Sequence, residues 1–314
     1  MTQNPSSLRT LITNCALILT ASLPVQGGAL SENFDSGFAP GVPIGTAYLD
    51  TSGGVSDSGC LKLTEAAFGQ MGTFIFDELD GWSPITGFRA SFNMKIGGGT
   101  GADGISFNFA GDYSWWTFGE EGEGSGLTIS FDTYDNGNGE APAIDIKYGW
   151  ATIFSQRGNL SLFRTGDFIP VIVNVDPDGS LDLTVNGQAV VENLVGAFSP
   201  TAGQFAFGAR TGGLDDYQFI DDLEIVTTTS SPVMPYLQYA SPQGNGARID
   251  SNIELVIRDA QTQLDPESIV VKLNGTAVPA VVSTWYDMTS VSYDPQAPLQ
   301  SGTEYIVEVS YSNQ

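Results

Sequence analysis

Four carboxylate side chains lie close together in one short stretch of the chain. Asp132, Asp135, Glu140 and Asp145 occur within fourteen residues, and no Lys or Arg stands among them. Carboxylates, amides and backbone carbonyls are the oxygen ligands that calcium prefers. Two carboxylates about 5 Å apart repel by about 3 kcal/mol at an effective dielectric constant near 20, so convergence needs a cation, a proton or a basic partner. The stretch predicts a calcium-binding loop, with a solvated acidic turn as the alternative.

The residues on either side of this loop alternate as in two neighbouring β-strands. Apolar residues occupy every second position in 127–131 and again in 144–148. Successive side chains of a strand point to opposite faces, so Asp132 and Asp145 both project outward if the apolar faces pack inward. Lys147 shares that face and is the nearest basic residue in sequence.

Alternation of this kind runs through most of the chain, and no long helical stripe interrupts it. The 314 residues include 38 glycines, a share of about 12% against a usual ~7%. Many short strands with Gly-rich turns are typical of an all-β sandwich. We expect a large sandwich over residues 28–228 and a small immunoglobulin-like sandwich over 229–314. The polar segment Thr227–Pro232 is the expected linker between them.

The charge balance and the residue types exclude several classes of function. A net charge of −25 argues against nucleic acid and anionic membranes as partners. The chain has no histidine, which excludes Ser-His-Asp catalysis and His-ligated zinc. Any chemistry here would have to run on carboxylates or on a metal ion.

The N-terminus has the pattern of a secretory signal. Residues 1–27 combine Arg9, an interrupted apolar stretch and small residues near Gly27, and the apolar stretch is too short for a transmembrane helix. We therefore expect a protein that is secreted, extracellular or on the cell surface. Because the sequence stops just after a predicted strand, we also expect it to be part of a larger extracellular protein.

Three segments of the sequence resemble a known family. The sequence GADGISFNF, followed by GLTISFDTYDN, is similar to the legume-type lectins and their bacterial relatives in the concanavalin-like sandwich superfamily. The sequence FAFGARTGGLDDYQFIDDLEI resembles the closing strands of bacterial members. The resemblance covers roughly residues 31–227. It implies a concanavalin-like jelly-roll fold, a carbohydrate partner (a glycan or a polysaccharide) and calcium as the cofactor.

The resemblance also implies roles for individual residues. The implied calcium ligands are Asp132, Tyr134 through its backbone carbonyl, Asn136 and Glu140. The implied carbohydrate-binding residues are Asp103, Gly104, Gly124, Tyr134 and Asn136. Ser130 replaces the acidic ligand that legume lectins have two residues before the aspartate, and their ligand histidine has no counterpart. We therefore expect no transition-metal site.

Aromatic residues close to this region offer a platform for a sugar ring. Tyr113, Trp115, Trp116 and Phe118 lie within six residues, and stacking against an aromatic face is one way to bind a sugar. If Trp115 and Trp116 are extended they point in opposite directions, so we expect at most one to be exposed. The alternative is that these rings are core or loop-anchoring residues.

Two other functions stay open beside carbohydrate binding. One is a structural or adhesive surface module without a sugar site, a role in cell adhesion. The other is a glycoside hydrolase, for which the closest motif is FDELDGWSP with Glu78 and Asp80. Its final acid is missing, because Trp82 and Ser83 stand there, and a retaining mechanism needs two carboxylates. We therefore expect no enzymatic activity.

Overall fold

The computed structural model describes residues 8–12, 25–137, 139–229, 235–260 and 262–313. Strands make up 55% of the structure and helices 3%, which confirms the all-β class. The helices are α1 (Leu160–Phe163) and the 3₁₀ turn η1 (Val55–Asp57). No helix in the described ranges has the length and hydrophobicity needed to cross a membrane.

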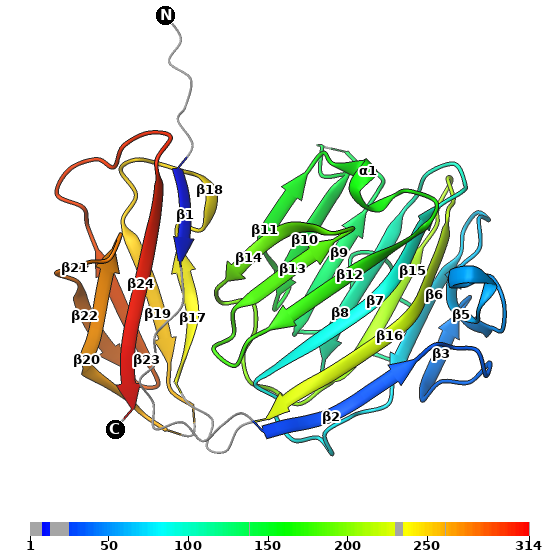
Figure 1. Ribbon diagram of the computed structural model, residues 1–314, viewed down its shortest axis with the longest axis horizontal. Coiled ribbons are helices and arrows are strands. Elements are labelled where there is room, and N and C mark those ends of the chain that lie inside the picture. The colour runs from blue at the N-terminus through cyan, green and yellow to red at the C-terminus, as the bar shows by residue number, and fades with distance from the viewer. Residues whose placement is uncertain (1–7, 13–24, 138, 230–234, 261, 314) are drawn as a thin grey trace, which may run out of the picture.

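The first domain, the large sandwich, consists of two antiparallel sheets (Figure 1). The seven-stranded sheet has the order β11 (Ala151–Arg157), β10 (Ala143–Tyr148), β9 (Leu127–Asp132), β8 (Gly104–Ala110), β15 (Gln204–Arg210), β6 (Met71–Phe76) and β3 (Gly41–Gly45). The eight-stranded sheet has the order β14 (Gln188–Leu194), β13 (Leu181–Val185), β12 (Phe168–Val175), β7 (Gly87–Gly97), β16 (Tyr217–Thr229), β5 (Cys60–Thr64) and β4 (Tyr48–Asp50), and β2 (Val25–Glu32) pairs with β16.

Phenylalanine rings fill the space between these two sheets. Phe88 of β7 lies 4.9 Å, centroid to centroid, from Phe205 of β15, and Phe92 lies 5.0 Å from Phe207. Phe107 of β8 contacts rings of both sheets and is fully buried. The period-two pattern places these rings on the inner faces, where edge-on and tilted pairs of aromatic rings add to the free energy of burial.

The expected strands and turns of this domain are largely confirmed. The predicted strands at 88–98, 103–111, 126–134, 143–149 and 168–176 correspond to β7, β8, β9, β10 and β12 within two residues at each end. The turns at Asp178-Gly179 and Asn186-Gly187 join β12 to β13 and β13 to β14. Strand β11 was not predicted, because its exposed sequence ATIFSQR has no clear alternation.

The second domain, the small sandwich, also has two sheets. The four-stranded sheet has the order β17 (Tyr236–Ser241), β19 (Ile253–Arg258), β23 (Met288–Tyr293) and β22 (Val281–Trp285). The five-stranded sheet has the order β18 (Gly244–Ala247), β1 (Leu8–Ile12), β24 (Glu304–Asn313), β20 (Leu264–Leu273) and β21 (Thr276–Val278). The likeness of this domain to immunoglobulin domains stays a prediction.

The chain between the domains differs from the expected linker. Strand β16 extends to Thr229 and pairs there with β2, so Thr227–Thr229 are strand and not linker. The remaining predicted linker residues, 230–232, lie outside the described residues. The linker prediction was wrong for its first three residues because their β-branched threonines continue the ladder of β16.

A direct contact joins the two sandwiches. Val195, which follows β14, is buried in the core of the small sandwich beside Leu237 and Ala240. Gln243 accepts a hydrogen bond from the Val195 N–H at 3.0 Å and donates one to the Val195 carbonyl at 3.2 Å. Figure 1 shows the small sandwich beside the β14 end of the large one. The small sandwich is therefore docked on the large one and not merely tethered to it.

The predicted signal segment lies mostly outside the described residues, since 1–7 and 13–24 are not among them. Residues 8–12 form β1, which pairs in parallel with β24 and antiparallel with β18. Strand β2 begins at Val25, so cleavage near Gly27 would remove the first three residues of that strand. The signal peptide stays a prediction.

The phenylalanine core makes a stability prediction. We expect Phe107→Ala to lower the free energy of unfolding by about 3–5 kcal/mol, because it removes a fully buried ring and leaves a cavity. Phe68→Ala is the matched control, since Phe68 is 67% exposed, and we expect a change within about 0.5 kcal/mol. Urea unfolding measures both, and equal effects of the two substitutions would contradict the assigned core.

Candidate functional site

A long loop lies over the outer face of the seven-stranded sheet. We call residues Gly111–Ser125 the covering loop. Ser106 of β8 donates a hydrogen bond to the carbonyl of Gly119 at 2.7 Å, and Thr73 of β6 both donates to the Phe118 carbonyl and accepts from its N–H. The sheet's polar outer side chains are consequently buried, with Ser106 fully covered.

An arginine fixes the covering loop to the end of the sheet. Arg210, the last residue of β15, forms ion pairs with Asp103 (Nε to Oδ2, 2.8 Å) and with Glu120 of the covering loop (Nη2 to Oε1, 2.5 Å). Glu120 is fully buried, and its other oxygen, Oε2, has no hydrogen-bond partner. Burial raises the pKa of Glu120 to about 7, although Arg210 lowers it. Burial likewise raises the pKa of Asp103.

Beside the covering loop lies a polar pocket with a volume of about 440 Å³. Its floor consists of outward side chains from three neighbouring strands: Thr128 and Asp132 of β9, Asp145 and Lys147 of β10, and Thr152 and Arg157 of β11. Its wall is the segment Glu121–Gly124 of the covering loop, and its other lining residues are Glu140 and Trp150. The pairing of Asp132 with Ala143 and of Asp145 with Ser130 confirms that Asp132 and Asp145 share the outer face.

Two glycines allow the wall to approach the sheet closely. A Cβ atom at Gly122 would lie 2.3 Å from the side-chain oxygen of Asn108 and 2.5 Å from Thr128. A Cβ atom at Gly124 would lie 2.4 Å from the Cβ of Ala110. Both glycines also have positive φ, which larger residues adopt only with strain. At Gly124, an implied carbohydrate-binding residue, the backbone therefore lies close against the sheet at the wall of the pocket.

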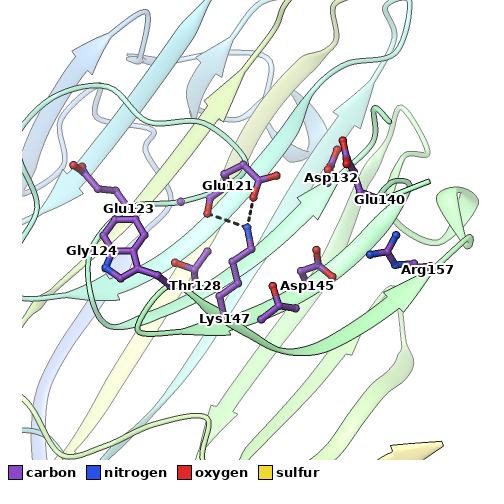
Figure 2. Close-up of a pocket in the computed structure, with 12 residues that line it drawn as sticks. Glu121, Glu123, Gly124, Thr128, Asp132, Glu140, Asp145, Lys147 and Arg157 are labelled. Atoms are coloured by element: carbon purple, nitrogen blue, oxygen red, sulfur yellow. Dashed lines mark hydrogen bonds and ion pairs between the residues drawn. The ribbon is translucent and has the colours of Figure 1, made fainter. Parts of the chain in front are cut away.

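The two cations of the pocket hold its loops in place. Figure 2 shows Lys147 reaching Glu121 of the covering loop, where its Nζ contacts the carboxylate and the carbonyl. Arg157 donates a hydrogen bond to the carbonyl of Gly139. Asp135 organises the same loop, since its Oδ1 accepts the N–H groups of Gly137, Gly139 and Glu140. Asp135 is thus committed to the local turn.

The carboxylates that line the pocket give it more hydrogen-bond acceptors than donors. Five carboxylates line it against two cations, a formal balance of −3. Oδ1 of Asp145 and Oε2 of Glu123 are buried and have no hydrogen-bond partner. Burial raises the pKa of Asp132 to about 6, and the nearby charges of Glu121, Glu140 and Asp145 add to the rise. The pocket is therefore suited to a ligand that donates hydrogen bonds.

The structure brings together some of the expected site residues and separates others. Asp132, Glu140 and Gly124 line the pocket. Asn136 and Tyr134 are exposed on the loop after β9 and do not line it. Two of the four predicted calcium ligands, Asp132 and Glu140, thus line the pocket, and the full ligand set stays a prediction.

The expected sugar-binding aspartate also lies elsewhere. Asp103 is buried, is paired with Arg210 and follows a cis peptide bond from Ala102. Gly104 lies in β8, opposite Asp132 in register. Neither residue lines the pocket. A sugar hydroxyl at Asp103 would have to compete with the guanidinium group of Arg210.

Sequence reasoning missed several pocket residues. Asp145 and Lys147 were placed on the correct face by alternation, but no role was assigned to them. Trp150 was missed because it lies in the turn after β10, beyond the alternating stretch. The adjacent Gly149, which has positive φ, is the sequence signal for that turn.

The expected aromatic platform is mostly structural. Tyr113 and Phe118 are buried, and their rings stack 5.8 Å apart against the sheet. Trp115 and Trp116 are both exposed, by 51% and 75%, so the expectation that at most one is exposed was wrong. Trp115 has positive φ, and the chain turns there instead of continuing as a strand.

The acidic residues do not form an assembled metal centre. Among the described residues, no three His, Cys, Asp or Glu side chains are arranged to hold a metal ion. The orphaned oxygen of Asp145 and the all-oxygen donor set suit calcium in chemistry, but the side chains do not converge on one point. The geometry alone therefore assigns no metal.

The raised pKa of Glu120 makes a pH-dependent prediction. The folded carboxyl has a pKa of about 7 against an ordinary value of 4.5, so the folded state binds more protons between these values and loses stability as pH rises. We expect Glu120→Gln to match the parent near pH 4 and to exceed its free energy of unfolding by on the order of 2 kcal/mol at pH 8. Urea unfolding at both pH values measures this.

The matched control for that prediction is Glu192→Gln, at an exposed position. We expect a change within about 0.5 kcal/mol at either pH. A Glu120→Gln protein that is less stable than the parent at pH 8 would show that the pair with Arg210 outweighs the cost of burial.

Comparison with known proteins supports the architecture. Neither family models nor curated proteins give a match to the chain. Among solved structures, the exoplasmic/lumenal domain of VIP36 in its Ca²⁺-bound form is 15% identical, with a TM-score of 0.50 over 66% of this chain and 92% of that one. The lectin UEA-II complexed with galactose is 17% identical, with a TM-score of 0.48 over 66% and 100%.

The carbohydrate recognition domain of Emp47p is a further structural neighbour, 16% identical, with a TM-score of 0.47 over 67% of this chain and 99% of that one. At these identities the comparison concerns the fold. The fold prediction is confirmed: the large sandwich is a concanavalin-like jelly roll of the kind found in legume-type lectins.

Proposed function

We propose that this protein is a secreted carbohydrate-binding module and that the pocket beside the covering loop holds a neutral sugar. The observation that carries the proposal is the surplus of buried acceptors in a pocket that also has an exposed tryptophan, Trp150. The legume-lectin type of fold supports a carbohydrate partner. The pocket has a volume of about 440 Å³, which is in the usual range for small-molecule sites.

Hydrogen bonding favours a sugar over an apolar ligand. An unsatisfied buried acceptor costs about 1–3 kcal/mol, and Asp145 and Glu123 each present one. Sugar hydroxyls donate hydrogen bonds and would satisfy both oxygens. An anionic ligand would meet the pocket's formal charge of −3, so we propose a neutral sugar and not an acidic one.

Trp150 supplies the apolar half of the interaction. Its side chain is 69% exposed, although it belongs to the pocket lining. The C–H face of a sugar ring can stack on the indole while its hydroxyl groups reach the floor. Lys147 and Arg157 fix the two flanking loops, so the site is organised before the sugar arrives.

Calcium is the second part of the proposal. Figure 2 shows Asp132 and Glu140 at the same end of the pocket, and repulsion among the carboxylates contributes to the raised pKa of Asp132. A divalent cation there would relieve this repulsion. Because the side chains of Asp132 and Glu140 do not converge, we propose that these two carboxylates move together when the ion binds.

The alternatives gain less support from the geometry. Asp80, of the hydrolase-like motif, accepts hydrogen bonds from Gly28 and Thr227, which fixes β2 to β16, and Glu78 accepts one from Asp80. These roles are those of a structural loop. A purely adhesive module would leave the acceptors of Asp145 and Glu123 unused, and a glycan array without any signal would favour it.

The sugar proposal is tested by an array of neutral and acidic glycans, including mannose- and galactose-terminated ones, followed by calorimetry. We expect binding to neutral glycans, and a loss of about tenfold or more in affinity for Trp150→Ala, because the stacking surface is removed. The control Trp116→Ala removes an equally exposed ring outside the pocket lining and leaves affinity unchanged. Equal losses in both variants would contradict the assigned pocket.

Calcium is tested by calorimetric titration of the protein after treatment with EDTA. We expect saturable binding in the parent and none in Asp132→Ala, since the buried carboxylate is the central ligand of the proposed site. The control Asp167→Ala removes an exposed carboxylate of the large sandwich and keeps the binding. No heat of binding in the parent would refute calcium while leaving the sugar proposal standing.

A further inference from the structure

All but one of the edge strands of the two sandwiches carry a feature that hinders pairing with a strand of another molecule. Such features are a charged side chain, a proline, an irregular register or a very short length. Within the described residues, β2, β11 and β14 have charged side chains and irregular registers, β3 has Pro43, β17 and β18 have irregular registers, and β4 and β21 have only three residues each.

The exception is β22, the edge strand of the four-stranded sheet. Its sequence VVSTW contains no charge, proline or glycine, its register with β23 is regular, and no strand among the described residues pairs with its other side. All five of its residues are exposed, Val281 by 70% and Trp285 by 71%. Figure 1 shows β22 on the side of the small sandwich that faces away from the large one. An unprotected apolar edge of this kind is a template for pairing with a further strand.

The turn that follows β22 exposes a second aromatic ring. Tyr286 is 87% exposed, and its φ of 52° is one that glycine adopts without cost and a bulky residue only with strain. Its ring lies 5.9 Å from that of Trp285, centroid to centroid. A ring that is held in a strained turn and left in solvent indicates a contact outside the single chain.

Charge favours a second copy of the chain at this edge over most of the remaining surface. Residues 273–286 carry no charge, whereas the whole chain has a net charge of −25. The next residue, Asp287, is paired with Arg258 at 2.9 Å. Two copies of so acidic a chain repel each other over most of their surfaces, and they can approach where charge is absent or neutralised. At β22 this obstacle is missing.

We propose that β22 pairs antiparallel with β22 of a second copy of this chain, so that the two four-stranded sheets join into one. A two-fold register centred on Ser283 pairs all five residues of the strand and places Trp285 of each copy opposite Val281 of the other. Both side chains lie on the outer face, since Val281 pairs with Ser292 and Trp285 with Met288, which are exposed. Aromatic and β-branched residues are favourable cross-strand partners.

The same register matches the other exposed side chains of the edge. On the inner face, Val282 of each copy lies opposite Thr284 of the other, and both residues are β-branched. Beyond the end of the strand, Tyr286 lies opposite Ala280. The rings and valines of the two copies together cover on the order of 1,000 Å², the area that a specific interface needs. A symmetric pair is also the commonest form of oligomer.

Sedimentation equilibrium of the full chain, from about 1 to about 100 μM, measures the association. We expect the parent to approach twice the mass of one chain and Ser283→Lys to bind its own copy about tenfold more weakly, because two like charges face each other at the two-fold axis. The control Ser301→Lys adds the same charge at an exposed serine outside β22 and keeps the dimer. A monomeric parent over the whole range, or a dimer that withstands Ser283→Lys, overturns the proposal.

A cysteine substitution tests the register. Ser283→Cys brings two thiols together at the two-fold axis, within the Cα separation of about 4.4–6.8 Å that a disulfide bond allows. We expect covalent dimers to form under mild oxidation about tenfold faster than in the control Ser301→Cys, which adds an exposed thiol outside β22. Equal rates in the two variants overturn the pairing through β22, and an unchanged melting temperature verifies that each variant is folded.

Discussion

The site depends on one constraint, that a polar sheet face is buried and each of its groups must find a partner. Serine, threonine and asparagine side chains on the outer face of the seven-stranded sheet would ordinarily be solvated. Here they lie under the covering loop, and hydrogen bonds such as that from Ser106 to Gly119 replace the bonds to water. Arg210 completes the attachment by pairing a carboxylate of the sheet end with one of the loop. Without this attachment the pocket would have a floor but no wall.

The same constraint explains the distribution of charge around the pocket. Both basic side chains, Lys147 and Arg157, are used to hold loops, so they do not neutralise the carboxylates of the floor. Asp135 is satisfied by three backbone N–H groups and takes no further part. What remains are acceptors without donors, and these give the pocket its chemical preference. The preference thus arises from how the loops are anchored as much as from which residues line the pocket.

Strand-level features could be predicted from the sequence, and loop-level features could not. Alternation predicted the outward faces of Asp132, Asp145 and Lys147, because side-chain direction in a strand depends only on the parity of the position. The positions of Tyr134 and Asn136 depend on the backbone of a loop whose turn is determined by Asp135, and periodicity carries no information about this. The pairing of Asp103 with Arg210 joins residues far apart in the sequence, so it follows from the order of β8 and β15 in the sheet. Trp150 lies in a turn, where no pattern distinguishes a ligand contact from an exposed ring.

The contact at Val195 has a consequence for folding. Its side chain belongs to the large sandwich by sequence and to the core of the small one by position. Separating the domains would expose this side chain, open a gap beside Leu237 and remove two hydrogen bonds to Gln243. Each domain therefore contributes to the other's resistance to unfolding. A boundary drawn between residues 228 and 229 falls one residue before the end of β16, and β1 near the N-terminus belongs to the small sandwich, so the two sandwiches do not divide cleanly along the sequence.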